Sequence, residues 1–299
     1  MSFVVLCIIM EFGTLSFSTQ LYWSILLIML LGIPHGAIDH VLFLERGSDG
    51  NENKPSEFYT FYFGLMIFYF VAWMLASTWS LIVFLFISAY HFGQSQFADL
   101  KNISRSESIF IHTSWGVSIL SGLLVYNYAD VIDIFQSSPD LSELVAVFDL
   151  ELIFILLSSS SIAAVVVILW LGYTKKVSSG RVVLELLTLG IIHTCFYTLP
   201  IIIGFTIYFT TIHSLTVMSE EFEFLKKKRN GFSILQFVQL LAPFTLLSII
   251  GSVILIVITR LGDIGVSDVL LVFILLSLVT LPHSIVMDGF YEKFHKRQT

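Results

Sequence analysis

Long runs of apolar residues alternate with short polar segments along the whole chain. Each run is close to the roughly 17–25 residues that an α-helix needs to cross a bilayer. The runs are longer, and alternate less, than the strands of a membrane β-barrel. The pattern therefore predicts an all-α, polytopic membrane bundle of about 9–10 transmembrane helices, forming a single integral-membrane domain over residues 1–299. The predicted spans are 3–18, 22–44, 58–77, 79–97, 108–126, 151–173, 182–199, 201–222, 233–259 and 268–290.

The composition agrees with this pattern. The chain is 56% hydrophobic and 12% charged, whereas soluble proteins carry about 25% charged residues. The net charge of −7 gives no sign of a nucleic-acid partner. Both cysteines lie inside apolar runs, so we expect neither a disulfide framework nor a thiolate metal site. The expected surroundings of the chain are the lipid bilayer.

Lysine and arginine predict the orientation, because they gather in the cytoplasmic loops of membrane proteins. The loop at 127–150 contains neither residue, so we place it outside. Alternation of the spans then places every basic residue except Arg260 inside. We therefore expect a multi-pass protein of a bacterial cytoplasmic (inner) membrane with its C-terminus in the cytoplasm.

Ionisable residues interrupt the apolar runs most densely at LGIPHGAIDH, residues 31–40. Such side chains inside a membrane usually have a function, because burying them is costly. Four histidines lie on four spans of the same direction, each about 12 to 15 residues from the outer end, or ~18–23 Å deep. These are His35, His91, His213 and His283. The other histidines of the later spans and tail, His112, His193 and His295, are interpreted as structural or solvated. A shared layer of imidazoles predicts a metal site.

The donor set limits the metal. Neutral imidazoles without thiolates suit Zn, Cu, Ni or non-haem iron. A metal-bound histidine usually donates its second ring N–H to a carboxylate or carbonyl. Asp39 follows His35 by one helical turn and is the predicted acceptor, for His35 or for a neighbouring ligand. Gln94, one turn after His91, is a second candidate for this role, and His40 is expected beside the site on another helix face.

Prolines and glycines accompany these histidines. Pro34 and Pro282 each directly precede a histidine of the layer. Because proline removes a helix hydrogen bond, we expect a kink that aims the next side chain inward. Gly32, Gly36 and Gly93 are expected to let neighbouring helices approach closely.

Four short motifs occur along the chain: PHGAIDH at 34–40, HFG at 91–93, YFTTIHSL at 208–215 and PH at 282–283. In this order they resemble the Brp/Blh family of membrane-embedded microbial β-carotene 15,15′-dioxygenases. The resemblance implies a non-haem iron oxygenase that holds Fe²⁺ through histidines and splits the central double bond of β-carotene with O₂. The products would be two molecules of all-trans-retinal, and a rhodopsin is a candidate acceptor for them. The motifs imply His35, His91 and His213 as ligands, and the late PH adds His283; no catalytic residue beyond the ligands is expected.

One position departs from the family. In many members the HS motif continues to a second histidine one turn later, where this chain has Val217. Valine cannot bind a metal. Either His283 completes the ligands, or another histidine takes that place, or the site is altered.

Three other interpretations stay open from the sequence. A haem protein could use histidines of neighbouring helices as axial ligands. A non-enzymatic carotenoid- or retinal-binding protein could assist opsin maturation without needing the four histidines. A transporter could pass protons along histidines and Asp39, although the inverted repeats typical of transporters are not evident here.

Overall fold

The structure, a computed structural model, describes residues 16–46, 54–101, 103–137, 141–262 and 268–296. These residues form helices and no strand, which confirms the all-α prediction. Eight helices of the described part are long and apolar enough to cross a membrane. The predicted span 79–97 forms a helix that is not among the eight, and most of the predicted span 3–18 lies outside the described residues. The chain is a multi-pass membrane protein.

The helices group into two compact units, each assembled from three separate stretches of the chain. The first unit consists of Met1–Gly32, Ala89–Asp133 and Phe148–Thr216. The second unit consists of Ile33–Ser88, Ile134–Val147 and Val217–Thr299. The single domain over 1–299 stays a prediction.

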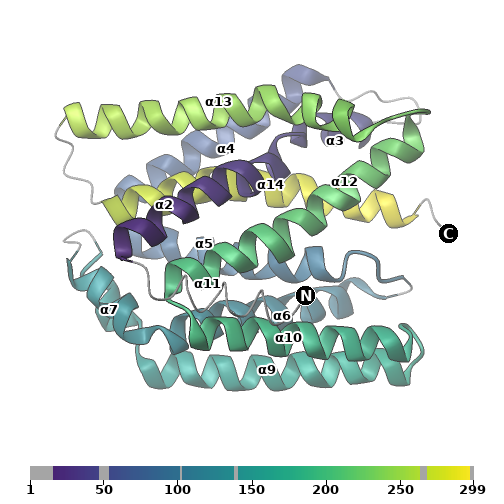
Figure 1. Ribbon diagram of the computed structural model, residues 1–299, viewed down its shortest axis with the longest axis horizontal. Helices are drawn as coiled ribbons and strands as arrows, with labels where there is room; N and C mark the ends of the chain where they lie inside the picture. Colours follow the sequence, from purple (N-terminus) through teal and green to yellow (C-terminus); the bar gives the residue numbers. More distant parts are fainter. Residues whose placement is uncertain (1–15, 47–53, 102, 138–140, 263–267, 297–299) are drawn as a thin grey trace. The chain divides into compact units, whose positions relative to one another are not determined.

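The first unit is built around α6, which packs along α9 and also against α10. Figure 1 shows α9 and α10 lying side by side as neighbouring helices joined by a short turn. The helices of this unit are α2 (Phe17–Leu27), η1 (Ile28–Gly32), the end of α5 (Ser77–Gln96), α6 (Arg105–Tyr126), the start of α7 (Tyr128–Ser137), α9 (Leu150–Tyr173), α10 (Ser179–Thr198), α11 (Ile201–Ile207) and η3 (Tyr208–Ser214). Because α6 is mostly buried, it forms the core of this unit.

α5 and α6 approach each other very closely at two glycines. A Cβ atom added to Gly93 would lie 1.9 Å from the carbonyl oxygen of His112. One added to Gly116 would lie 1.6 Å from the carbonyl oxygen of Ala89. No side chain fits at either point, so the backbones themselves are in contact, as expected for Gly93. This crossing fixes the end of α5 that carries His91.

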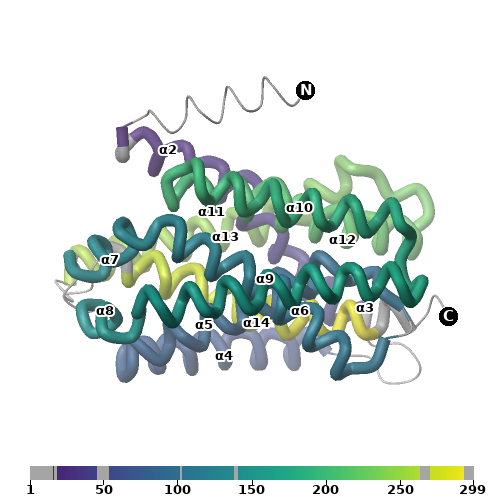
Figure 2. Tube along the Cα trace, turned by 90° about the horizontal axis from the view of Figure 1, so that it is seen from below, coloured from purple at the N-terminus to yellow at the C-terminus, as the bar shows by residue number. Residues whose placement is uncertain are grey.

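The second unit is built around α14, which packs against α4 and α3. Figure 2 shows α14, in yellow, running alongside α4. The helices here are η2 (Ile33–Gly36), α3 (Asp39–Arg46), α4 (Pro55–Leu75), the start of α5, the end of α7, α8 (Leu144–Val147), α12 (Leu215–Lys228), α13 (Ile234–Leu261) and α14 (Asp268–Lys296). The indole of Trp73 donates a 2.7 Å hydrogen bond to the Ser277 hydroxyl and joins α4 to α14.

Proline affects the two histidine-bearing segments differently. Near Pro34 the chain passes from the π-helix η1 into the 3-10 helix η2, and α-helix resumes only at Asp39. This interruption is what a missing backbone N–H predicts. At Pro282, by contrast, α14 continues as an α-helix on both sides. Pro34 therefore places His35 on an irregular turn, while His283 lies within the unbroken helix α14.

Candidate metal centre

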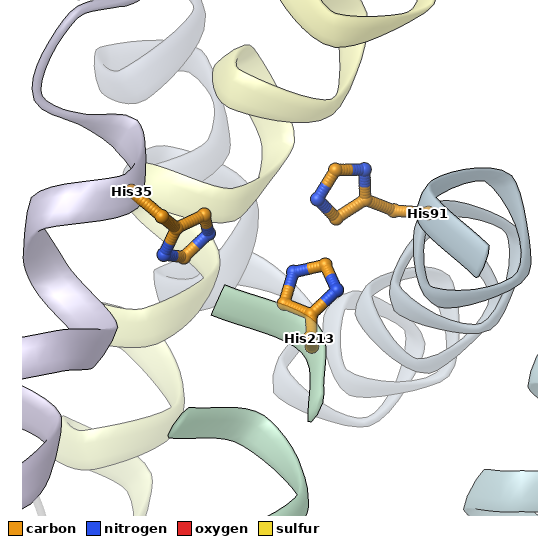
Figure 3. Close-up of side chains that lie close together, drawn as sticks. All are labelled: His35, His91 and His213. Carbon is orange, nitrogen blue, oxygen red and sulfur yellow. The ribbon is translucent and has the colours of Figure 1, made fainter. Parts of the chain in front are cut away.

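In the first unit, His91 on α5 and His213 on η3 face one another (Figure 3). Their ring centroids are 4.9 Å apart and their planes are nearly perpendicular, at 80°. The side chains are buried, with 1% and 2% of each residue exposed. His91 and His213 thus bring two buried imidazoles into edge-to-face contact.

Ser95 determines which nitrogen of His213 is the donor to a metal. The Ser95 hydroxyl donates to the carbonyl oxygen of Phe92 at 3.0 Å and lies 2.9 Å from His213 Nδ1. A hydroxyl has only one hydrogen to donate. Nδ1–H of His213 therefore donates to the Ser95 oxygen, which leaves the lone pair on Nε2. This is the tautomer that metal-bound histidines usually have, with the other ring N–H held by the protein.

Aromatic rings fix the plane of the His213 imidazole. Phe209, one turn earlier, stacks on it at 5.6 Å with an interplanar angle of 21°. Phe92 contacts it edge-to-face at 4.8 Å. These contacts occur where the helix is a π-helix, Tyr208–Ser214, and π-helical turns are frequent at functional sites. The wider turn changes the register of this segment, so a uniform α-helix would aim His213 differently.

In the second unit, His35 and His283 form a similar pair. Their ring centroids are 4.7 Å apart and their planes meet at 87°. His283 Nδ1 lies 2.8 Å from Oδ1 of Asp39. Because an ionised carboxylate can only accept, Nδ1–H of His283 is the donor and its Nε2 carries the lone pair. The structure thus places Asp39 against His283, one of the two roles that the sequence left open.

Asp39 is itself held in place by the protein. The Tyr62 hydroxyl donates to its other oxygen, Oδ2, at 3.0 Å. Asp39 also lies in the first turn of α3, where the helix dipole favours a negative charge. Only 2% of the residue is exposed. Its carboxylate is therefore a fixed, buried negative charge that orients His283.

Three buried histidines, His35, His91 and His213, form a group that could hold a metal ion, and each offers one ring nitrogen (Figure 3). The donor set fits a divalent transition metal that binds imidazole, since it contains no thiolate. It fits a haem poorly. Two axial histidines have a porphyrin between them, whereas the rings within each unit touch.

The other residues singled out from the sequence, His40, Gln94 and His193, have different contacts from those of the four proposed ligands. The His40 ring contacts Phe244, with centroids 4.0 Å apart, and also Phe58. Gln94 is buried on α5, three residues after His91. In the first unit, His193 Nε2 bonds the Ser118 hydroxyl at 3.0 Å, in keeping with a structural role.

Two relevant residues, Ser95 and Tyr62, have no role in the sequence interpretation. Ser95 follows His91 by four residues, and this spacing is the one signal that marks it. Tyr62 is indistinguishable from its neighbours in the aromatic run 58–73.

The comparison with known families decides the identity. A family model described as β-carotene 15,15′-dioxygenase matches residues 26–291, which is most of the chain. The chain belongs to this family. The match includes all four histidines of the two pairs, and the resemblance to the Brp/Blh family seen in the motifs is confirmed. No curated protein and no solved structure matches the chain.

Proposed function

We propose that this member of the β-carotene dioxygenase family cleaves the central 15,15′ double bond of β-carotene with O₂ and releases two molecules of all-trans-retinal. The observation that carries the proposal is the family match over residues 26–291, together with the buried imidazoles that this match includes. The cofactor in this proposal is Fe²⁺, and the enzyme is a non-haem iron oxygenase. The membrane is the bacterial cytoplasmic membrane, with the C-terminus in the cytoplasm.

We assign the ligands residue by residue. His35, His91 and His213 are the proposed metal ligands, and His283 is the proposed fourth. Ser95 holds Nδ1 of His213, and Asp39 holds Nδ1 of His283. Both bonds turn Nε2 toward a ligand role and prevent ring rotation. Bound ferrous iron would supply the ability to activate O₂, which ordinary side chains lack.

The protein's own contribution is orientation and exclusion of water. The four histidines are buried, with 8% or less of any of them exposed. β-carotene is an apolar rod that dissolves in the bilayer, so a site among membrane helices receives it without a passage through water. A water-free site also protects reactive species from side reactions. Cleavage of the double bond with O₂ needs no acid or base from the protein, so the proposal gives the imidazoles the role of ligands only. A rhodopsin is the candidate acceptor for the retinal.

The proposal is tested in bacterial cells that accumulate β-carotene. Cells that express the chain should lose β-carotene and gain retinal, measured by chromatography of extracted pigments. His213→Ala should abolish retinal formation, because it removes a proposed ligand. His295→Ala, in the basic C-terminal tail, is the matched histidine replacement and should retain activity. Equal amounts of each variant in the membrane fraction make the comparison valid.

Two outcomes would contradict the proposal. Undiminished β-carotene without retinal, with the wild-type chain present in the membrane, would exclude this substrate. Longer apocarotenals in place of retinal would show cleavage at another bond. Iron content of the purified protein then tests the cofactor, and it should fall in His213→Ala relative to His295→Ala.

A further inference from the structure

The link between α12 and α13, in the second unit, contains a hollow of about 450 Å³ that the proposed metal centre does not use. α12 ends at Lys228 and α13 begins at Ile234 (Figure 1), and both helices belong to candidate membrane spans. A link between two consecutive spans lies at a membrane surface, so the hollow lies at the level of the lipid headgroups. Four polar and two apolar side chains line it: Arg229, Asn230, Gln236, Gln239, Phe232 and Leu240.

Local sequence signals build this link. Gly231 has a φ of 75° within a turn that the Phe232 N–H closes on the Arg229 carbonyl oxygen at 3.1 Å. The next residue, Ser233, caps α13: its hydroxyl accepts the Gln236 N–H at 3.3 Å, and Gln236 Oε1 accepts the Ser233 N–H at 2.9 Å. The backbone of the link is therefore fixed by hydrogen bonds, and the lining side chains start from fixed positions around the hollow.

The polar side chains of the lining have N–H groups that the protein leaves available. Among the described residues, the amides of Asn230 and Gln239 have no hydrogen-bond partner. Gln236 uses its amide oxygen in the cap of α13, which leaves its NH₂ group. Arg229 binds Glu45 through Nη2 at 3.1 Å, and a guanidinium has five N–H donors. Four side chains thus direct donors to one hollow, which suits a ligand rich in acceptor oxygens.

The charges at this hollow favour an anion. None of its six lining residues is acidic. Lys228 and Arg229 both form ion pairs with a single carboxylate, Glu45, so two positive charges share one negative charge. Basic side chains at the end of a membrane helix attract anionic lipids, because the lipid surface is negative. An anion with several oxygens therefore satisfies both the donors and the excess positive charge.

The hollow also has an apolar side that continues into the membrane. Phe232 and Leu240 belong to its lining. From there α13 continues as an apolar helix of 28 residues, of which only Phe237 and Leu241 are buried. Its exposed side chains include Leu235, next to Gln236. A free phosphate ion would use only the donors, whereas a phospholipid would use the donors through its headgroup and the apolar side through its acyl chains.

We propose that the hollow between α12 and α13 is a binding site for the headgroup of an anionic phospholipid. The phosphodiester oxygens accept hydrogen bonds from Arg229 and from the amides of Asn230, Gln236 and Gln239. The acyl chains lie along the exposed face of α13. Because α13 buries so few of its own residues, the bound lipid strengthens the connection between its first turns and the end of α12. The site depends neither on the metal centre nor on the substrate.

The test is lipid binding by the purified full-length protein in a non-ionic detergent. Native mass spectrometry compares bound phosphatidylglycerol, which is anionic, with phosphatidylcholine, which has no net charge. Phosphatidylglycerol should bind the wild type more tightly and raise its unfolding temperature. Arg229→Gln should weaken this binding about fivefold, the usual contribution of one basic side chain at an anionic lipid surface. Lys175→Gln is the matched control, because it removes one positive charge from the turn between α9 and α10, and it should leave binding unchanged.

Arg229→Gln also breaks the ion pair with Glu45, so a second variant tests the hollow alone. Asn230→Ala combined with Gln239→Ala removes two amides that have no hydrogen-bond partner among the described residues. The double variant should unfold at the wild-type temperature without lipid and bind phosphatidylglycerol about fivefold more weakly, as expected for two lost hydrogen bonds. Wild-type binding by the double variant would overturn the assignment of the site to this hollow.

Three other results would overturn the proposal. Equal binding of phosphatidylglycerol and phosphatidylcholine would exclude recognition of an anionic headgroup. Equal losses in Arg229→Gln and Lys175→Gln would show a general attraction of the basic surface rather than a site. Stabilisation of the wild type by inorganic phosphate as large as that by phosphatidylglycerol would assign the hollow to a free anion and exclude a contribution from the acyl chains.

Discussion

The two histidine pairs are built alike but anchored differently. In the first unit, His213 donates its Nδ1–H to a neutral hydroxyl, Ser95. In the second unit, His283 donates to the carboxylate of Asp39. A hydrogen bond to a charged group is roughly twice as strong as one between neutral groups. The hydroxyl therefore mainly orients its ring, while the carboxylate also makes its imidazole a stronger donor to a cation.

The two units also differ in what surrounds each histidine pair. The first unit supplies a rigid pair whose rings are fixed by Phe209, Phe92 and the close crossing of α5 and α6. The second unit instead contains the carboxylate of Asp39, which accepts a hydrogen bond from His283. Variants of the first unit should then act mainly through geometry, and variants of the second mainly through electrostatics.

Removal of the Asp39 charge should have the largest effect on metal affinity. Asp39→Asn keeps the shape but loses the charge and weakens the hold on His283, so we expect ~100-fold weaker Co²⁺ binding, the upper end for such partners. The control is Asp149→Asn: Asp149 caps α9 through the Leu152 N–H, and asparagine caps a helix equally well. Binding is measured by titrating the chelator-stripped protein with Co²⁺, whose visible absorption reports binding without any turnover. If Asp39→Asn lowered Co²⁺ affinity by less than about threefold, the result would contradict the electrostatic role of the second unit.

A single variant can disturb the packing of the first unit without replacing a proposed ligand. Gly93→Ala would place a Cβ atom 1.9 Å from the carbonyl oxygen of His112 and force α5 away from α6. Overpacking of this kind costs about 1–3 kcal/mol of stability. Thermal unfolding in detergent measures it, and the displaced His91 should weaken Co²⁺ binding as well.

Gly64→Ala is the matched control for that change. Gly64 also lies inside a helix, α4, but a Cβ atom there would have no neighbour within 4 Å. Alanine should leave that helix unchanged or stabilise it by about 0.5–1 kcal/mol. If both alanine variants unfolded alike, close approach at the α5–α6 crossing would not be what holds the first unit together.

The sequence predicted the helices well because their signals are local. The span expected at 151–173 forms α9, Leu150–Tyr173, and the span expected at 108–126 forms α6, which begins three residues earlier. Ser104 and Glu107 form a capping box that sets this earlier start. Apolar length and capping pattern act within a few residues of the chain, so both can be read without knowledge of the fold.

The surroundings of the histidines were harder to predict because they depend on tertiary contacts. Asp39 follows His35 by one turn, yet its hydrogen-bond partner is His283, 244 residues further along the chain. Tyr62 reaches Asp39 from another helix, and nothing in its own stretch separates it from neighbouring tyrosines. The π-helical turn that aims His213 also has no local signature. Candidate ligands can therefore be found from residue type and depth, whereas their partners require the fold.

Ser95→Ala should lower Co²⁺ affinity less than Asp39→Asn does. The size of this difference measures how much the charge of the Asp39 anchor contributes. The variant removes a neutral acceptor, so His213 keeps its stacking on Phe209 but loses the bond that selects its tautomer. We expect Co²⁺ affinity to fall about 10-fold. Ser88→Ala is the control on the same helix, because the buried Ser88 hydroxyl has no hydrogen-bond partner among the described residues, so its loss should leave Co²⁺ affinity unchanged. A loss for Ser95→Ala as large as that for Asp39→Asn would show that charge is not what distinguishes the two anchors.

Tyr62→Phe should give the smallest loss of Co²⁺ affinity, because Tyr62 acts on the metal only through Asp39 and His283. The variant removes the hydrogen bond that Tyr62 donates to Asp39 Oδ2 and leaves the one that His283 Nδ1–H donates to Asp39 Oδ1. Loss of one such bond is worth about 1 kcal/mol, which corresponds to about fivefold in Co²⁺ affinity. Tyr59→Phe, on an exposed neighbour in the same aromatic run, should leave the affinity unchanged. If Tyr62→Phe matched Asp39→Asn, the tyrosine would be holding the whole carboxylate in position, and the charge of Asp39 would matter less than its orientation.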